Sequence, residues 1–231
     1  MFPTAELDRL AVRYPALPYV APFVAFLLAI AIGHGRPPGP GFWYPLTVAL
    51  GIVSLLLFSR RVLNIRVSRF TGSILLGAAV FAVWIAPDLL WPSYRTHLLF
   101  QNGLTGEARS HLPDFLRNSA WFLVLRVGSS VLLVPLVEEL FWRAWLMRYA
   151  ISKDFEQVPL GTYTAAAFWI TAALFASEHG PYWDVGLLAG IAYNWWMVRT
   201  RSLGDCILAH AVTNALLAAY VIGGNHWQYW L

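Results

Sequence analysis

Long runs of apolar residues, separated by short polar gaps, dominate the chain. Most runs approach or exceed the ~20 residues that a helix needs to cross the hydrocarbon core of a bilayer. Lipid cannot satisfy exposed backbone N–H and C=O groups, so each run is predicted to be a helix. The pattern predicts an all-α, polytopic transmembrane bundle of about seven or eight helices in one domain, residues 1–231. The predicted spans are residues 18–33, 42–59, 70–91, 119–147, 163–179, 183–198 and 203–222.

The stretch 92–118 is the longest gap between apolar runs. It mixes Leu98, Leu99 and Phe115 with polar residues, a composition typical of a helix that lies in the membrane interface. We therefore expect an interfacial helix here, or part of an eighth span.

The composition supports the membrane assignment. The chain is 58% hydrophobic and 12% charged, whereas a soluble domain carries about 25% charged residues. Twelve Trp and ten Tyr residues suit the aromatic belts of bilayer interfaces. The single cysteine, Cys206, excludes an intramolecular disulfide and a Cys-rich metal site. The net charge of +4 comes from arginines in the gaps between apolar runs. That pattern indicates topology signals and no nucleic-acid partner.

The cationic residues also predict an orientation. With a cytoplasmic N-terminus, ten fall on the cytoplasmic side: Arg9, Arg13, Arg60, Arg61, Arg66, Arg69, Arg148, Lys153, Arg199 and Arg201. Four fall on the opposite side: Arg36, Arg95, Arg109 and Arg117. The excess favours this orientation by the positive-inside rule. We expect a multi-pass protein of the cell (inner) membrane.

Two adjacent carboxylates interrupt the apolar run 119–147. Each ionisable group at the bilayer centre costs roughly 2.5–3.5 kcal/mol on insertion scales, so Glu138 and Glu139 require partners or water. Glu139 and Arg143 are four residues apart and share a helix face. Arg143 can therefore neutralise Glu139, while Glu138 points elsewhere. These residues alone also fit a structural ion pair at a helix end.

Two later spans carry further polar motifs. Phe175 and His179 lie four residues apart at the end of one span, and His210 and Asn214 share the same spacing within another. Taken singly, His179 fits a helix cap. His210 and Asn214 fit interhelical hydrogen bonding, as does Asn194.

In sequence order, Glu-Glu-x-x-x-Arg, Phe-x-x-x-His and His-x-x-x-Asn resemble the motifs of the CPBP family. This family comprises the type II CAAX prenyl endopeptidases and bacterial relatives such as the Abi proteins. The resemblance covers residues 119–220, the predicted catalytic core. The segment Phe-Ala-Ser-Glu-His-Gly is similar in sequence to a bacterial subgroup, the CAAX prenyl protease-related proteins associated with exosortase systems.

The resemblance implies an intramembrane endopeptidase of the glutamate-dependent type. On the family pattern, Glu138 together with His179 activates the water, and the Glu139–Arg143 pair holds the site together. The resemblance also implies a substrate that is a membrane-embedded or lipid-anchored peptide or protein, either prenylated or unmodified. The other partner it implies is the lipid bilayer.

The same resemblance assigns His210 and Asn214 to the oxyanion of the tetrahedral intermediate. Span lengths alone place His179 and His210 at different depths, so we expect tilted or broken helices. We expect no cofactor and no metal. Alternatives remain open: a zinc site of Glu138, His179 and His210, a non-catalytic scaffold or immunity protein, and a transporter. A transporter usually has repeated halves, which this sequence lacks.

Overall fold

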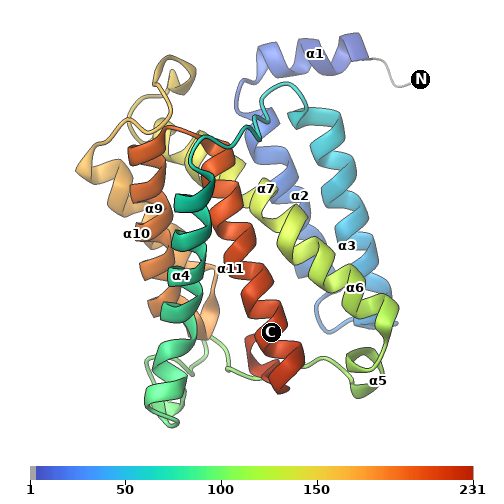
Figure 1. Cartoon of the computed structure of the whole chain (residues 1–231). Helices are drawn as coiled ribbons and strands as arrows, with labels where there is room; N and C mark the ends of the chain where they lie inside the picture. The colour runs from blue at the N-terminus through green and yellow to red at the C-terminus, as the bar shows by residue number, and fades with distance from the viewer. Residues whose placement is uncertain (1–3, 231) are drawn as a thin grey trace.

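The computed structural model describes residues 4–230, and those residues form a bundle of helices without a β-strand (Figure 1). The predicted all-α fold is confirmed. Helices occupy all seven predicted spans, and no end differs from its predicted position by more than two residues. After α1 (Thr4–Arg13) they are α2 (Leu17–Gly33), α3 (Pro40–Ser54) with its extension η1 (Leu55–Ser59), α4 (Phe70–Leu90), the continuous segment Ala120–Tyr149, α9 (Ala165–Ser177), α10 (Trp183–Thr200) and α11 (Leu203–Gly224).

Four of these segments are long and apolar enough to cross a membrane: Pro40–Ser59, Phe70–Leu90, Ala120–Tyr149 and Leu203–Gly224. The helices α2 and α9 are also apolar, but α9 has only 13 residues. The protein is thus a helical membrane protein, as the composition predicted.

The helix 120–149 runs obliquely through the bundle (Figure 1). Its parts are α6 (Ala120–Gly128), η3 (Ser129–Leu133), α7 (Val134–Glu139), η4 (Leu140–Leu146) and α8 (Met147–Tyr149). Both η3 and η4 are π-helical, so their turns are wider than those of an α-helix. Pro135 lies two residues after the end of η3, and proline has no N–H to donate to the preceding turn. Such wide turns are frequent at functional sites, and here they flank the Glu-Glu pair.

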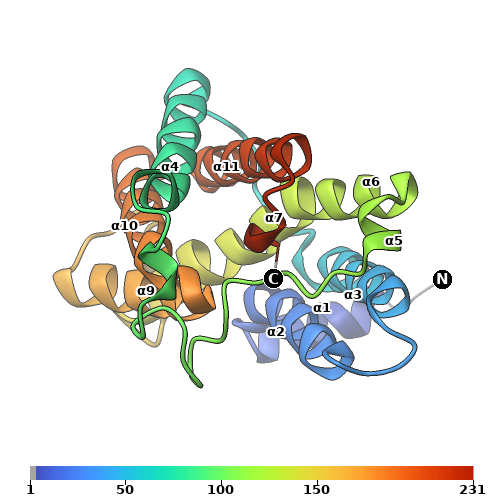
Figure 2. The same ribbon diagram turned by 90° about the horizontal axis from the view of Figure 1, so that it is seen from below.

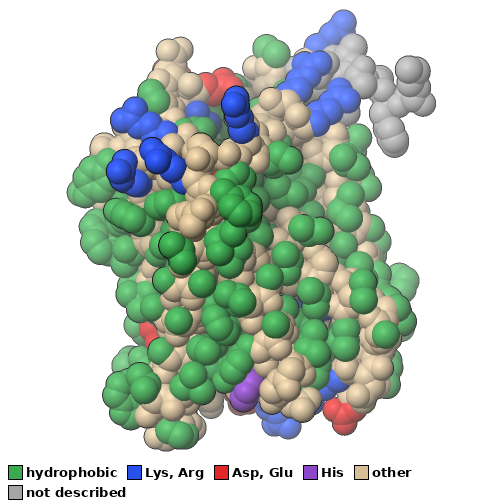
Figure 3. Space-filling view, viewed as in Figure 1, with side chains coloured by type: hydrophobic (Ala, Val, Ile, Leu, Met, Phe, Trp, Pro, Cys, Tyr) green, Lys and Arg blue, Asp and Glu red, His purple; other side chains and the backbone are tan. Residues whose placement is uncertain are grey.

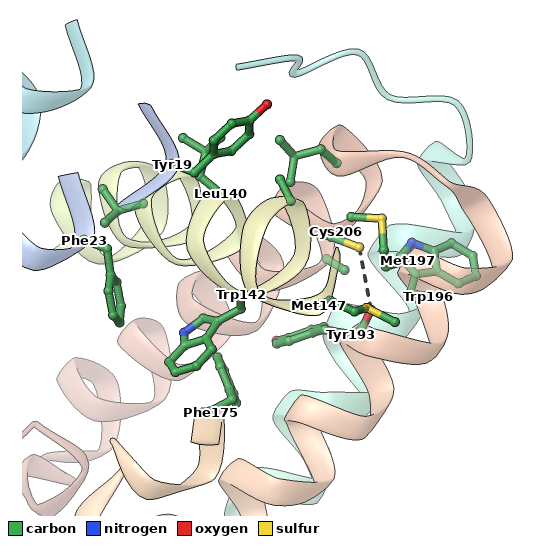
Figure 4. Packing of buried hydrophobic residues seen from close by; sticks show 14 of the residues in the cluster. Tyr19, Phe23, Leu140, Trp142, Met147, Phe175, Tyr193, Trp196, Met197 and Cys206 are labelled. Carbon is green, nitrogen blue, oxygen red and sulfur yellow. Dashed lines mark hydrogen bonds between the residues drawn. The ribbon is translucent and has the colours of Figure 1, made fainter. Parts of the chain in front are cut away.

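The oblique helix separates two groups of helices (Figure 2). One side holds α2 and α3, and the other holds α4, α9, α10 and α11. Side chains from both groups pack on it (Figure 4). Phe23 stacks on Phe141 at 4.0 Å between ring centroids, and Trp142 meets Phe175 edge-on at 6.0 Å. In lipid, such close packing rather than the hydrophobic effect holds helices together.

The prediction of an interfacial helix in 92–118 is wrong. This stretch contains the single turns η2 (Tyr94–Thr96) and α5 (Asp114–Arg117), and the rest is irregular. Pro92 and Pro113 interrupt helix formation because they lack a backbone N–H. Leu98 and Leu104 remain 78% and 99% exposed, so the stretch presents apolar side chains without a helix.

A buried arginine fixes this irregular stretch to the bundle. Arg95 is 6% exposed, and its Nε donates to Oδ1 of Asp88 at 3.1 Å. Its Nη1 donates to the carbonyl of Pro181 at 2.8 Å and also to Asp184. Arg95 therefore joins the loop after α4 to the beginning of α10.

Candidate active site

Glu139, Arg143 and His210 form a buried, hydrogen-bonded cluster. Oε1 of Glu139 accepts a hydrogen bond from Nη1 of Arg143 at 3.1 Å and lies 2.8 Å from Nδ1 of His210. Glu139 and Arg143 have no exposed side-chain surface, and His210 is 5% exposed. A carboxylate buried without partners costs several kcal/mol, so the two donors stabilise its charged form. The ion pair expected from helical spacing is present, and His210 joins it from α11.

Asn194 on α10 positions the arginine of this cluster. Nε of Arg143 donates to Oδ1 of Asn194 at 3.1 Å, and Nδ2 of Asn194 donates to the carbonyl of Phe168 at 2.8 Å. Cζ of Arg143 also lies 4.4 Å from the ring centroid of Phe175, within the range of a cation–π interaction. The interhelical bonding expected of Asn194 is present, and it connects the oblique helix to α9 and α10.

Glu138 lies outside the ion pair and faces a cavity. The cavity has a volume of about 190 Å³, and its lining includes Glu138, His179, His210 and Asn214. Oε2 of Glu138 is buried and has no hydrogen-bond partner. Buried polar atoms are nearly always paired, and a cavity of this size has room for several waters. Glu138 therefore brings to the cavity lining a carboxylate whose buried oxygen Oε2 has no partner within the protein.

His179 reaches the same cavity from the turn after α9. Its Nδ1 lies 2.8 Å from the carbonyl oxygen of Phe175. A carbonyl can only accept, so Nδ1 carries the proton, and Nε2 of the neutral ring keeps a lone pair. A Cβ at Gly186 would come within 3.1 Å of this ring. Glycine at that position therefore lets α10 approach the histidine closely.

His210 and Asn214 complete the cavity from α11. Nδ2 of Asn214 donates to the carbonyl of Ser130 at 2.8 Å, which leaves the amide one further N–H. The His210 ring stacks on Tyr193, with centroids 5.1 Å apart and planes 21° apart. The Tyr193 hydroxyl donates to Oγ1 of Thr213 at 2.7 Å. The His210 ring is thus fixed by two contacts: Nδ1 lies against Glu139, and one face of the ring stacks on Tyr193.

The six predicted site residues therefore separate into two adjoining groups. Glu138, His179, His210 and Asn214 line the cavity, and His210 links it to the buried Glu139–Arg143 pair. The oblique course of the helix 120–149 brings the groups together despite the unequal depths expected from span lengths. The cavity is also lined by aromatic residues that the sequence analysis did not single out, including Trp84, Tyr193, Tyr229 and Trp230.

These aromatic residues had no distinguishing signal in the sequence. Trp84 lies 5.2 Å from the His179 ring, between centroids, yet its position in an apolar helix is typical of a belt or packing residue. Tyr229 and Trp230 follow α11, beyond the last predicted span. Only the fold places them at the cavity.

The zinc alternative requires Glu138, His179 and His210 to converge as ligands. Among residues 4–230, no three His, Cys, Asp or Glu side chains form a group that could hold a metal ion.

Comparison with known proteins gives one family. Residues 119–216 match the model described as Type II CAAX prenyl endopeptidase Rce1-like. No curated protein and no solved structure matches the chain. The match supports the family expected from the three motifs, and the matched segment contains all six predicted site residues. The family is one of membrane proteases, so the match supports hydrolase activity in general.

Proposed function

We propose, from the premise that residues 119–216 form a domain of the type II CAAX prenyl endopeptidase family, that this protein is an intramembrane endopeptidase. Its substrate is a peptide segment of a membrane-associated protein. The reaction adds water across one peptide bond inside the cavity lined by Glu138 and His179. No cofactor takes part.

Glu138 is the general base. Its carboxylate belongs to the cavity lining and accepts a proton as the water oxygen attacks the carbonyl carbon. Nε2 of His179 accepts a hydrogen bond from the second O–H of the same water and so orients it, and that hydrogen stays on the attacking oxygen. When the tetrahedral intermediate collapses, the C–N bond breaks and Glu138 returns its proton to the leaving amine. A positioned acid–base group typically contributes about 10²–10⁴-fold to the rate.

His210 and Asn214 stabilise the oxyanion. Nδ1–H of His210 is committed to Glu139, so donation from Nε2 as well requires a ring that carries a proton on both nitrogens. Asn214 supplies its second N–H. Each donor of this kind is typically worth about 10²–10³ in kcat. Arg143 and Asn194 act one step further away by fixing Glu139.

The single observation that carries the proposal is that the Glu138 carboxylate lines one cavity together with His179, His210 and Asn214. The test compares membrane peptides in cells that express wild type, Glu138→Gln or the control Glu107→Gln, which changes an exposed loop residue. Peptides cut in wild type should accumulate uncut only with Glu138→Gln. Identical peptide profiles in all three strains would reject proteolysis and favour a scaffold role.

A further inference from the structure

Cationic side chains gather at one end of the bundle (Figure 3). This arginine-rich end consists of α1, the loop between η1 and α4, the segment from α8 to α9, and the junction of α10 and α11. Ten of the sixteen Lys and Arg residues belong to it, and four belong to the opposite, arginine-poor end. Because short cytoplasmic loops carry the excess of Lys and Arg, the arginine-rich end is the cytoplasmic one.

The cavity lies toward the arginine-poor end. The turn that carries His179 continues into Pro181, whose carbonyl accepts from Arg95 at 2.8 Å. The next residue, Tyr182, donates to the carbonyl of Gln228 at 3.1 Å. The His179 turn therefore contacts two segments of that end: the loop after α4 and the segment after α11.

The segment 225–230 forms one wall of the cavity. Asn225 adopts a left-handed conformation, φ 56°, that ends α11 and turns the chain. Tyr229 and Trp230 then line the cavity, and the Tyr229 hydroxyl donates to Oδ2 of Asp88 at 2.7 Å. We name this segment the 225–230 wall. Displacing it would therefore open the cavity on the side that this segment covers.

Buried side chains fill the bundle between the site and the arginine-rich end, and Figure 4 labels most of them. Each of them is at most 1% exposed: Leu140, Arg143, Met147, Tyr193, Met197 and Cys206. Neither water nor a peptide can pass through such packing without separating helices. The two ends of the bundle thus differ in both charge and access.

We propose that the catalytic cavity is loaded from the arginine-poor end, so that its substrates are peptide segments presented at the extracytoplasmic face of the membrane. This inference rests on the proposed hydrolase function for the identity of the bound molecule. The aromatic lining contributed by Trp84, Tyr229 and Trp230 suits apolar side chains next to the scissile bond. A peptide whose cleavage site is held at the cytoplasmic surface, including one with a lipidated C-terminal cysteine, does not reach Glu138.

Access to the cavity is measurable without activity. In a Cys206→Ala background, single cysteines are placed at Lys153 in the arginine-rich end, at Gly103 in the arginine-poor end and at Leu217 in the cavity. Cα of Gly103 has open space for a side chain, and Lys153 is exposed. Intact cells are treated with a charged, membrane-impermeant methanethiosulfonate. Gly103→Cys and Leu217→Cys should react, and Lys153→Cys should react only after permeabilisation. Reaction of Leu217→Cys only after permeabilisation, or not at all, would overturn the inference.

A second experiment separates this inference from the proposed function. A randomised peptide linker is placed on either side of a single-span membrane anchor and expressed with wild type or Glu138→Gln. Cleavage of extracytoplasmic linkers alone, dependent on Glu138, is expected. Cleavage of cytoplasmic linkers alone overturns the route of entry and leaves the hydrolase assignment intact. No Glu138-dependent cleavage on either side contradicts the hydrolase assignment, while the cysteine labelling still reports where the cavity opens.

Discussion

Nδ1 of His210 lies 2.8 Å from the same Glu139 oxygen that accepts from Arg143. One carboxylate thus links a cavity histidine to a buried cation. It fixes the ring orientation of His210 and so the position of Nε2, the nitrogen proposed to donate to the oxyanion. Changes at Glu139 should therefore affect both stability and the chemical step.

Glu139→Gln should destabilise the protein by about 3–5 kcal/mol, because removing one partner of a buried ion pair leaves Arg143 uncompensated. Activity should fall mainly in kcat, since the effect on His210 is realised in the transition state. Thermal unfolding in detergent and steady-state kinetics measure the two effects. Wild-type stability in this variant would contradict the central place given to the pair.

Glu138→Gln is the matched comparison one residue earlier. Oε2 of Glu138 has no partner to lose, and a neutral amide of similar size removes a costly buried charge. Stability should be unchanged or higher, whereas cleavage should fall by about 10²–10⁴-fold because the base is lost. Measurable activity near the wild-type level would remove Glu138 from the mechanism.

Asn194 is expected to act as a positioning residue for Arg143. Asn194→Leu removes the acceptor of the Arg143 Nε–H and should cost about 1–3 kcal/mol of stability. kcat should fall with little change in KM. Asn194→Asp keeps an acceptor for Arg143 and should recover part of kcat, a rescue that a purely structural loss would not show.

Metal removal should leave the enzyme active. Glu138, His179 and His210 do not converge as metal ligands, and the proposed mechanism uses only protons and hydrogen bonds. Treatment with a strong zinc chelator, followed by dialysis, should therefore preserve the rate of cleavage. Inactivation that added Zn²⁺ reverses would restore the zinc alternative.

Tyr229→Phe should loosen the 225–230 wall, because it removes the hydrogen bond to Asp88. The labelling rate of Leu217→Cys should then rise relative to the same cysteine with Tyr229 intact. Burial, reinforced by the hydrogen bond with Asp88, raises the pKa of Tyr229. The stability from this raised pKa is fully present below the unfolded value of about 10 and is lost as pH rises through the higher folded value. After correction for the ionisation of the cysteine thiol, the labelling rate of Leu217→Cys with Tyr229 intact should not change between neutral pH and about pH 9.

The helices and the Glu139–Arg143 pair were predictable because they depend on local order along the chain. An apolar run fixes a helix, and a spacing of four places two residues on one face. The contact between His210 and Glu139 depends on how two separate helices cross. It therefore cannot be predicted from residue spacing within either helix. The oblique course of the central helix and its wide turns beside Pro135 decide that crossing.

The stretch 92–118 is a case in which the sequence pattern predicted a helix that the structure does not contain. Its apolar residues resemble a membrane-surface helix, but Arg95 has three partners, Asp88, Pro181 and Asp184, that hold the chain in an irregular path. These partners are distant in sequence or belong to other helices. The aromatic cavity residues could not be predicted for a related reason. A Trp in a membrane helix, such as Trp84, is equally typical of an interfacial belt and of helix packing.

The short helix α9 has a consequence for the surrounding lipid. Its 13 residues extend about 20 Å at 1.5 Å per residue, less than the ~30 Å thickness of the hydrocarbon core. Hydrophobic mismatch of this kind thins the bilayer locally, and α9 ends next to His179. Thinning there would draw the aqueous phase toward the catalytic water, so turnover should depend on acyl-chain length and be faster in thin bilayers than in thick ones.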